Sequence, residues 1–230
     1  MLVNDFIFCS TIAGVVCKDG VILGTEKIVI NKMMVSGTDK RIFSVTKNIG
    51  SVANGLTPDG RALMYRARDE STQYEEMFGI NIPGKTLAER MALQCQMKTI
   101  YSGQRPFGST IIFAAHDMMQ GHTLWMIEPS GQCFQYYGCA SGRGKQLARN
   151  EIERGNFRDM TVEQAMPIFA KLMIKAQEEM KEKKQELEIS VLRADNNPKL
   201  NWVHKILDRA TTDKITADAQ TAIDEDEEMN

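Results

Sequence analysis

The chain has 230 residues, of which 43% are apolar and 25% are charged, the proportions of an ordinary folded protein. At about 150 residues per domain, this length allows one large domain or two small ones, and such a core needs no disulfide or metal to hold it. Lysine and arginine number 28 against 30 aspartate and glutamate residues, so the chain lacks the basic excess of a protein that wraps duplex nucleic acid.

The five cysteines form no closely spaced pair and their number is odd, which indicates reduced thiols and a cytosolic or nuclear protein. They are Cys9, Cys17, Cys95, Cys133 and Cys139. No run approaches the ~18 consecutive apolar residues of a membrane-spanning helix. The apolar start at residues 6–9 is too short for a secretory signal and lacks a basic flank. We therefore expect no contact with a membrane.

The first quarter of the chain predicts two β-hairpins. Four apolar, β-branched runs have the composition of strands: residues 11–17, 21–28, 41–46 and 50–54. Asp19-Gly20 between the first two runs indicates a tight turn, which we attribute to the freedom of Gly20 to adopt a positive φ. The second pair turns at Lys47-Asn48.

Two helices are predicted next, because the apolar spacing changes from a period of 2 to a period of 3.6. Thr57 is the expected N-cap of the first, followed by Pro58 in the first turn, and its apolar positions continue towards Met77. Thr86 and Glu89 form a capping-box pattern that opens the second helix.

The second half of the chain returns to strands and then to helices. Strands are predicted at residues 109–115, 123–127, 132–137 and 186–192, and helices at residues 145–153 and from about 161 towards 184. Thr161 and Gln164 form a capping box for the last helix, and Pro167 inside it predicts a kink or a later start. Everything past residue 196 is polar, and its acidic run at residues 224–228 is expected to be solvated and mobile.

Strands grouped with strands and helices with helices favour an α+β fold over a parallel βαβ sheet. Two antiparallel sheets that each need a cover suggest a layered sandwich flanked by helix pairs. No repeat of 20–50 residues is apparent.

The sequence predicts no metal and no cofactor. The glycine-rich stretch at residues 138–146 fails the phosphate-loop pattern at Cys139 and Gln146, so its glycines are assigned to a tight strand-to-helix crossing. His116 and His122 are six residues apart with a turn between them, and no cysteine or histidine pair has the ligand spacing of a zinc site.

The first hairpin contains the segments Ser10-Thr11-Ile12-Ala13-Gly14, Lys18-Asp19-Gly20 and Gly24-Thr25-Glu26, and Lys40-Arg41 follows. In these segments the chain resembles the start of the proteasome core subunits. In the active beta members of that family, an N-terminal threonine attacks the peptide carbonyl with help from its own α-amine, an aspartate and a lysine, and the amine must be free to accept a proton. Here the nucleophile position falls on Ser10, inside the chain. The aspartate position holds Glu26, and the lysine position falls on or next to Arg41, whose guanidinium does not deprotonate. The resemblance therefore predicts no catalytic residue in this chain.

From residue 10 to residue 192 the chain resembles the alpha branch of the family, the outer rings of the 20S core. The matching segments are Cys17-Lys18-Asp19-Gly20-Val21, Asp39-Lys40-Arg41-Ile42-Phe43, Ala53-Asn54-Gly55-Leu56, Asp59-Gly60-Arg61, Arg66-Ala67-Arg68, Tyr101-Ser102, Arg105-Pro106-Phe107-Gly108, Ile127-Glu128-Pro129-Ser130-Gly131, Gly138-Cys139-Ala140 with Gly142 and Lys145, and Glu151-Ile152-Glu153. Within that branch, Asn81-Ile82-Pro83 and the acidic end are most similar to the alpha-type-3 group.

The resemblance implies a four-layer αββα sandwich of the N-terminal nucleophile hydrolase type. We expect three parts: residues 1–9 as an atypical stub, residues 10–192 as the alpha-type domain, and residues 193–230 as a polar C-terminal region with an acidic tail. The family's N-terminal gating helix has no counterpart in residues 1–9, so we expect that segment upstream of residue 1.

The implied function is structural: a non-catalytic alpha-ring subunit that gates substrate passage for ubiquitin-dependent degradation, in the cytoplasm and nucleus. Its implied partners are neighbouring alpha subunits, the beta ring and regulatory ATPase or activator particles. The position of Lys40 implies a pocket residue for the C-terminal tails of those activators, against the alternative of an ordinary surface lysine. A second hypothesis is a divergent N-terminal nucleophile hydrolase, activated by cleavage before Ser10.

Overall fold

The computed structural model describes residues 10–28, 33–35, 37–177, 185–194 and 202–228. Ten strands form two sheets in this part of the chain: β1 (Ile12–Cys17), β2 (Gly20–Ile28), β3 (Ile42–Thr46), β4 (Ile49–Gly55), β5 (Ser109–Asp117), β6 (Gly121–Ile127), β7 (Cys133–Tyr136), β8 (Gly138–Ser141), β9 (Gln185–Ala194) and β10 (Trp202–Ile206). The helices are α1 (Thr57–Phe78), α2 (Gly84–Ile100), α3 (Lys145–Arg154), the short 3₁₀ turn η1 (Phe157–Asp159), α4 (Val162–Gln177) and α5 (Arg209–Glu228).

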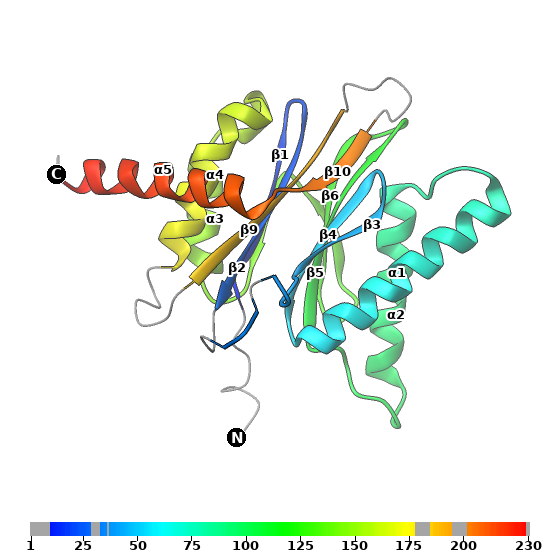
Figure 1. The fold of residues 1–230 in the computed structure, drawn as a ribbon. Coiled ribbons are helices and arrows are strands. Elements are labelled where there is room, and N and C mark those ends of the chain that lie inside the picture. Colours follow the sequence, from blue (N-terminus) through cyan, green and yellow to red (C-terminus); the bar gives the residue numbers. More distant parts are fainter. Residues whose placement is uncertain (1–9, 29–32, 36, 178–184, 195–201, 229–230) are drawn as a thin grey trace.

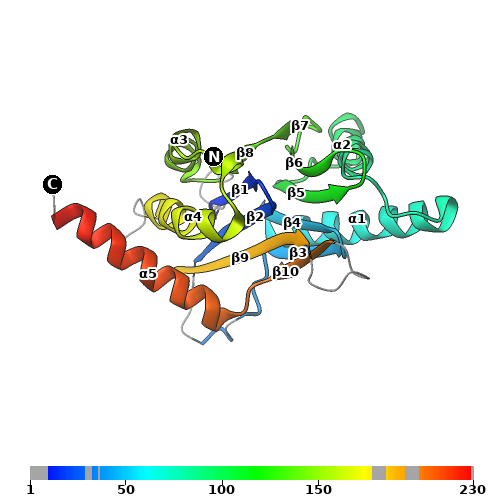
Figure 2. The same ribbon diagram turned by 90° about the horizontal axis from the view of Figure 1, so that it is seen from above.

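The two sheets lie face to face and helices cover both outer faces, as Figures 1 and 2 show. The first sheet has the order β10-β9-β2-β1-β8, the second has the order β3-β4-β5-β6-β7, and each neighbouring pair is antiparallel. Helices α3 and α4 pack on the first sheet, and α1 and α2 pack on the second. The expected α+β class and four-layer αββα sandwich are therefore confirmed.

Side chains alternate between the two faces of each strand, and they fill three apolar layers: one between the sheets and one between each sheet and its helices. On β2, Ile22 faces α4, whereas Val21 and Leu23 face the second sheet. Phe169 of α4 and Phe113 of β5 are the bulkiest of the fully buried side chains, and they lie in the two outer layers. This period-2 division is what allowed the strands to be predicted from the sequence.

The first hairpin forms as predicted, but for a different physical reason. Lys18 and Asp19 make the turn, and Gly20 pairs with Cys17 as the first residue of β2. Gly20 does not have a positive φ. Instead, a Cβ at this position would lie 2.4 Å from the carbonyl oxygen of Leu192 in β9, so close approach of the backbones requires the glycine.

The predicted helix starts differ from the observed ones at α1 and α2. Helix α1 begins at Thr57 with Leu56 as its N-cap, so Thr57 is inside the helix rather than its cap. Helix α2 begins at Gly84 after Pro83, two residues before Thr86, and no side chain caps it. The capping box of α4 is confirmed, because Thr161 and Gln164 exchange hydrogen bonds between their side chains and backbone N–H groups. The helix keeps this start in spite of Pro167, so the expected later start is wrong.

Two strands, one helix and the short turn η1 are absent from the sequence-based prediction. Strand β8 lies in the glycine-rich stretch and pairs with β1 as the edge strand of the first sheet. Strand β10 and helix α5 lie in the region described above only as polar. Ala219 and Ile223 of α5 are buried against Ala170 and Ile174 of α4. Residues 224–228, which were expected to be mobile, form the last turns of α5, with Asp224 and Glu225 exposed.

Some sequence-based expectations fall outside the described residues. These are the residue 1–9 stub and the continuation of the fourth helix from residue 178 to residue 184. Among the described residues, no helix combines the length and apolar character that crossing a membrane requires.

Candidate functional site

The position of the family nucleophile lies just before β1 and is buried. Ser10 is 3% exposed, and its hydroxyl has no hydrogen-bond partner among the described residues. Gly142, with φ of +106°, lies against it so closely that a Cβ would be 2.3 Å from the Ser10 carbonyl oxygen. Because Ser10 follows Cys9 in the chain, its nitrogen is a peptide amide and does not accept the hydroxyl proton.

The next residue fastens this end of β1 to the glycine-rich loop. Thr11 is fully buried, and its hydroxyl accepts a hydrogen bond from the backbone N–H of Gly144 at 3.1 Å. Its carbonyl accepts one from the N–H of Glu26 at 3.0 Å. Gly142 and Gly144 therefore serve the crossing from β8 to α3, as the sequence predicted for these glycines. A loop amide that could face a phosphate is instead bonded to Thr11.

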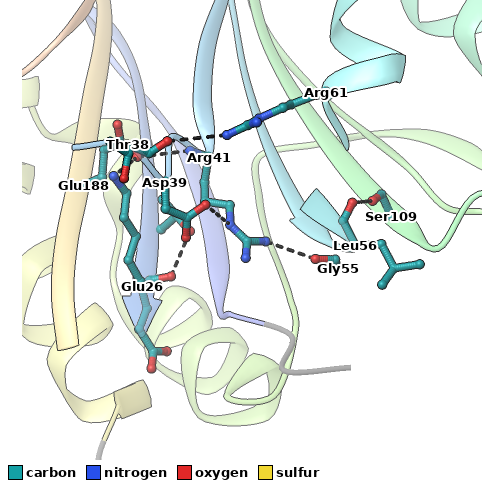
Figure 3. Close-up of polar contacts among 11 residues, drawn as sticks. Glu26, Thr38, Asp39, Arg41, Gly55, Leu56, Arg61, Ser109 and Glu188 are labelled. Atoms are coloured by element: carbon teal, nitrogen blue, oxygen red, sulfur yellow. Dashed lines mark hydrogen bonds and ion pairs between the residues drawn. The ribbon is translucent and has the colours of Figure 1, made fainter. Parts of the chain in front are cut away.

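Glu26 and Arg41 occupy the positions of the catalytic aspartate and lysine of the active beta members. Both side chains make contacts within the fold, several of which are drawn in Figure 3. Glu26 is 4% exposed on β2. Arg41 donates from Nη1 to the carbonyl of Gly55 at 3.0 Å, and its Nε lies 3.4 Å from Oδ1 of Asp39. Its backbone N–H donates to Glu188 of β9 at 3.3 Å. The guanidinium thus connects the start of β3 with the end of β4.

A second ion pair closes the same end of the sandwich. Nζ of Lys27 lies 2.8 Å from Oε2 of Glu188, and both side chains are only 12% exposed. Glu188 thereby contacts both Lys27 and the backbone of Arg41. The sequence-based hypothesis included neither Lys27 nor Glu188, since Glu188 is 147 residues from Arg41 and no local motif marks it.

Lys40 is exposed and lies on the rim of a small hollow formed by the first turn of α1 and the facing ends of β3 and β4. Arg41 and Arg61 also line this hollow, so three cationic side chains lie around it. Arg61 donates from Nη2 to the carbonyl of Thr38 at 3.4 Å (Figure 3). Among the described residues, no carboxylate is within ion-pair distance of Lys40.

The motif residues Asp59 and Arg105 hold the α1 side of the hollow in place. Arg105 donates to both carboxylate oxygens of Asp59, at 2.7 and 2.8 Å, and the backbone N–H of Gly108 donates to the same carboxylate at 2.8 Å. The hydrogen bonds from Arg105 are the main reason that the pKa of Asp59 is lowered. Ser109 donates from its hydroxyl to the carbonyl of Leu56, which ties β5 to the beginning of α1 (Figure 3).

Two of the three histidines lie side by side, although their spacing in the sequence did not indicate a site. His116 and His122 lie opposite each other on β5 and β6, with their Nδ1 atoms 3.1 Å apart. The ring of Trp202 stacks on His116 at 3.9 Å and contacts His122 at 4.3 Å, both measured between centroids. Burial lowers the pKa of His116 to about 4, with His122 adding to the effect, and burial also lowers the pKa of His122.

Comparison with known proteins agrees with the motifs. The model of the proteasome subunit family matches residues 9–192. Proteasome subunit alpha type-3 of Arabidopsis thaliana is 42% identical over 180 residues, which cover 78% of this chain and 72% of the relative. The protein of the same name from Acanthamoeba castellanii is 36% identical over 220 residues, or 96% of this chain and 85% of the relative.

A relative that is named alpha type-7 instead of alpha type-3 has a comparable sequence identity to this chain. Probable proteasome subunit alpha type-7 of Saccharomyces cerevisiae is 37% identical over 184 residues, or 79% of this chain and 64% of the relative. The chain belongs to the proteasome subunit family and is an alpha-type, structural subunit of that complex, similar to relatives named alpha type-3.

Proposed function

We propose that this chain takes a place in the outer alpha ring of the 20S core, beside other alpha subunits and above the beta ring. There it helps to gate the passage of substrates in ubiquitin-dependent degradation and to dock regulatory ATPase or activator particles. The observation that carries this proposal is the state of Ser10: a buried hydroxyl on a residue whose nitrogen is an amide. The chain then contributes no nucleophile to the threonine-type peptidase, and its site of action is the cytoplasm and nucleus.

The alternative is a hydrolase released by cleavage before Ser10. It requires a free amine at Ser10 and a substrate path to the hydroxyl, and Ser10 is 3% exposed. The intact mass of the chain in native particles separates the two hypotheses. The structural role is supported if the chain is not cleaved before Ser10 and if particles carrying Ser10→Ala keep their peptidase activity. Cleavage at that bond, with activity lost in Ser10→Ala, would overturn it.

We further propose that Lys40 receives the terminal carboxylate of an activator tail. The exposed ammonium stands at the rim of a shallow hollow that Arg41 and Arg61 also line, so a carboxylate that docks at this rim meets a positive environment. Arg41 is already bonded to Asp39 and Gly55, and Arg61 donates to the carbonyl of Thr38, whereas Lys40 is exposed and has no carboxylate partner among the described residues. A hydrogen bond between charged groups is worth about 1.5–3 kcal/mol.

The test measures activator-tail binding to assembled particles. A synthetic activator-tail peptide with a free C-terminal carboxylate should bind this pocket roughly 10- to 150-fold more weakly after Lys40→Ala, as that energy range implies. The matched control is Lys47→Ala, an exposed lysine at the opposite end of β3, which should leave binding unchanged. Equal affinity of wild-type and Lys40→Ala particles would make Lys40 an ordinary surface lysine.

A further inference from the structure

The β5–β6 hairpin carries two nitrogen donors and two sulfur donors within seven residues of sequence. Its sequence runs His116-Asp117-Met118-Met119-Gln120-Gly121-His122. The two histidines form a cross-strand pair at the base, and Met118 and Met119 occupy the loop. These methionines are 97% and 94% exposed. They therefore contribute almost nothing to the core, where methionine is usually found.

The turn itself is held by Asp117 rather than by the methionines. One carboxylate oxygen of Asp117 accepts the backbone N–H groups of Met119 at 3.0 Å and Gln120 at 2.6 Å. This local pattern fixes the loop backbone and leaves both thioether side chains without a structural task. Substitutions at the two methionines are thus expected to leave the fold intact.

The spacing of the histidine nitrogens fits a chelated metal ion. With the two Nδ1 atoms 3.1 Å apart and metal–nitrogen bonds of about 2.0–2.1 Å, the angle at the metal is roughly 95–102°. This angle is close to the tetrahedral value. The ring of Trp202 stacks on His116 and contacts His122, so it helps to hold both imidazoles in place.

We propose that this hairpin binds one monovalent copper ion, through Nδ1 of His116, Nδ1 of His122 and a thioether sulfur of Met118 or Met119. Thioether sulfur is a soft ligand that selects Cu(I), whereas imidazole suits several metals. In the described part of the chain, no three His, Cys, Asp or Glu side chains are grouped to hold a metal, so the sulfur supplies the third donor and the selectivity. Binding requires both Nδ1 lone pairs, so the proton shared between the two rings moves to an Nε2 atom.

The test is a titration of the full chain with Cu(I) under anaerobic, reducing conditions, against a chromophoric Cu(I) chelator. Accessible thiols are alkylated first, since thiolates also bind Cu(I). The pKa values of Cys17, Cys95, Cys133 and Cys139 are raised to about 11–12, mainly by burial, so these thiols stay protonated. We expect one Cu(I) per chain, with quenching of tryptophan fluorescence from Trp202.

Three variants decide the outcome. The double variant Met118→Leu, Met119→Leu keeps the apolar surface and should weaken Cu(I) binding by at least about tenfold without changing the weaker Zn²⁺ binding. His122→Gln should abolish both, and its melting curve shows whether it folds. The control Met77→Leu, at an exposed position in α1, should bind as wild type does. Cu(I) affinity unchanged in the double leucine variant, or Zn²⁺ bound as tightly as Cu(I), would overturn the proposal.

Discussion

His204 is a buried histidine that connects the two sheets, and its protonation couples the stability of the fold to pH. It lies on β10 and is 6% exposed. Its backbone N–H donates to the carbonyl of Lys47 at 2.7 Å, and its Nδ1 lies 2.7 Å from the hydroxyl of Ser44. The ring occupies the space over Gly50, where a Cβ would be 2.0 Å away.

The environment of this ring favours its neutral form. Burial lowers the pKa of His204 from 6.5 to about 4. The guanidinium of Arg68 donates to the carbonyl of Ser44, so a positive charge already lies on the α1 side, and Lys47 is next to the turn. Nε2 has no hydrogen-bond partner among the described residues, so no carboxylate is bonded to the ring.

The sign and size of the pH effect follow from that lowered pKa. Between pH 6.5 and about 4 the folded chain binds fewer protons than the unfolded chain, so the free energy of unfolding decreases as the pH falls. Above pH 6.5 there is no loss, and below about 4 the loss is complete. At about 1.4 kcal/mol per pH unit, the full loss is about 3 kcal/mol, of which about 2 kcal/mol is present at pH 5.

Urea unfolding at pH 7.5 and pH 5.0, followed by tryptophan fluorescence, measures this loss. The variant His204→Asn retains a polar group near the Ser44 hydroxyl but does not titrate. Its free energy of unfolding should fall by about 2 kcal/mol less than that of the wild type between the two pH values. His116 and His122 are present in both proteins, so their contribution cancels in the comparison.

A destabilising change that keeps the imidazole provides the control. Ile206→Val, two residues along β10, should lower stability by about 0.5–1.5 kcal/mol at both pH values and preserve the wild-type pH dependence. If His204→Asn loses as much stability between pH 7.5 and pH 5.0 as the wild type does, the buried ring is not the source of the effect.

Four further changes test contacts elsewhere in the fold. Gly20→Ala should lower stability by about 2 kcal/mol or more and reduce the melting temperature, because its Cβ would meet a backbone oxygen at 2.4 Å, whereas Gly103→Ala, in open space, should be neutral. Arg105→Gln should cost about 1 kcal/mol at pH 7, a small value because the arginine is largely exposed, and the difference should shrink as the pH falls and Asp59 becomes protonated. In chemical denaturation, Ile223→Ala should cost about 2–3 kcal/mol, and deletion of the last seven residues should change little.

The strands and the long helices could be predicted because their signals are local. The alternation along β1 and β2 and the apolar period of α1 lie within single segments, and their observed bounds agree closely with the prediction. Helix α5 carries the same kind of signal in Ile215, Ala219 and Ile223, spaced four apart, but most of its other residues are polar. The face that covers this narrow stripe is on α4, and no local pattern reveals it.

The candidate site likewise has residues that could be predicted from the sequence and partners that could not. Ser10, Glu26, Lys40 and Arg41 were found because they lie in one N-terminal motif of the family. Their partners were not found, since long-range pairing of strands decides them. Glu188 reaches Arg41 because β9 pairs with β2 along nine residues. His116 and His122 meet because the three-residue loop between β5 and β6 sets their register, which spacing in the sequence alone did not indicate.

The interior cations at this end of the sandwich form ion pairs within the fold. A catalytic amine and a lysine near the nucleophile must be free to exchange protons. In this chain Lys27 is paired with Glu188 and Arg41 with Asp39, so these interior cations hold strands together. Lys40, one residue before Arg41, is exposed, whereas the Arg41 side chain is only 14% exposed. The same short segment therefore presents one cation to the fold and the next to the surface, where we propose that an activator tail binds.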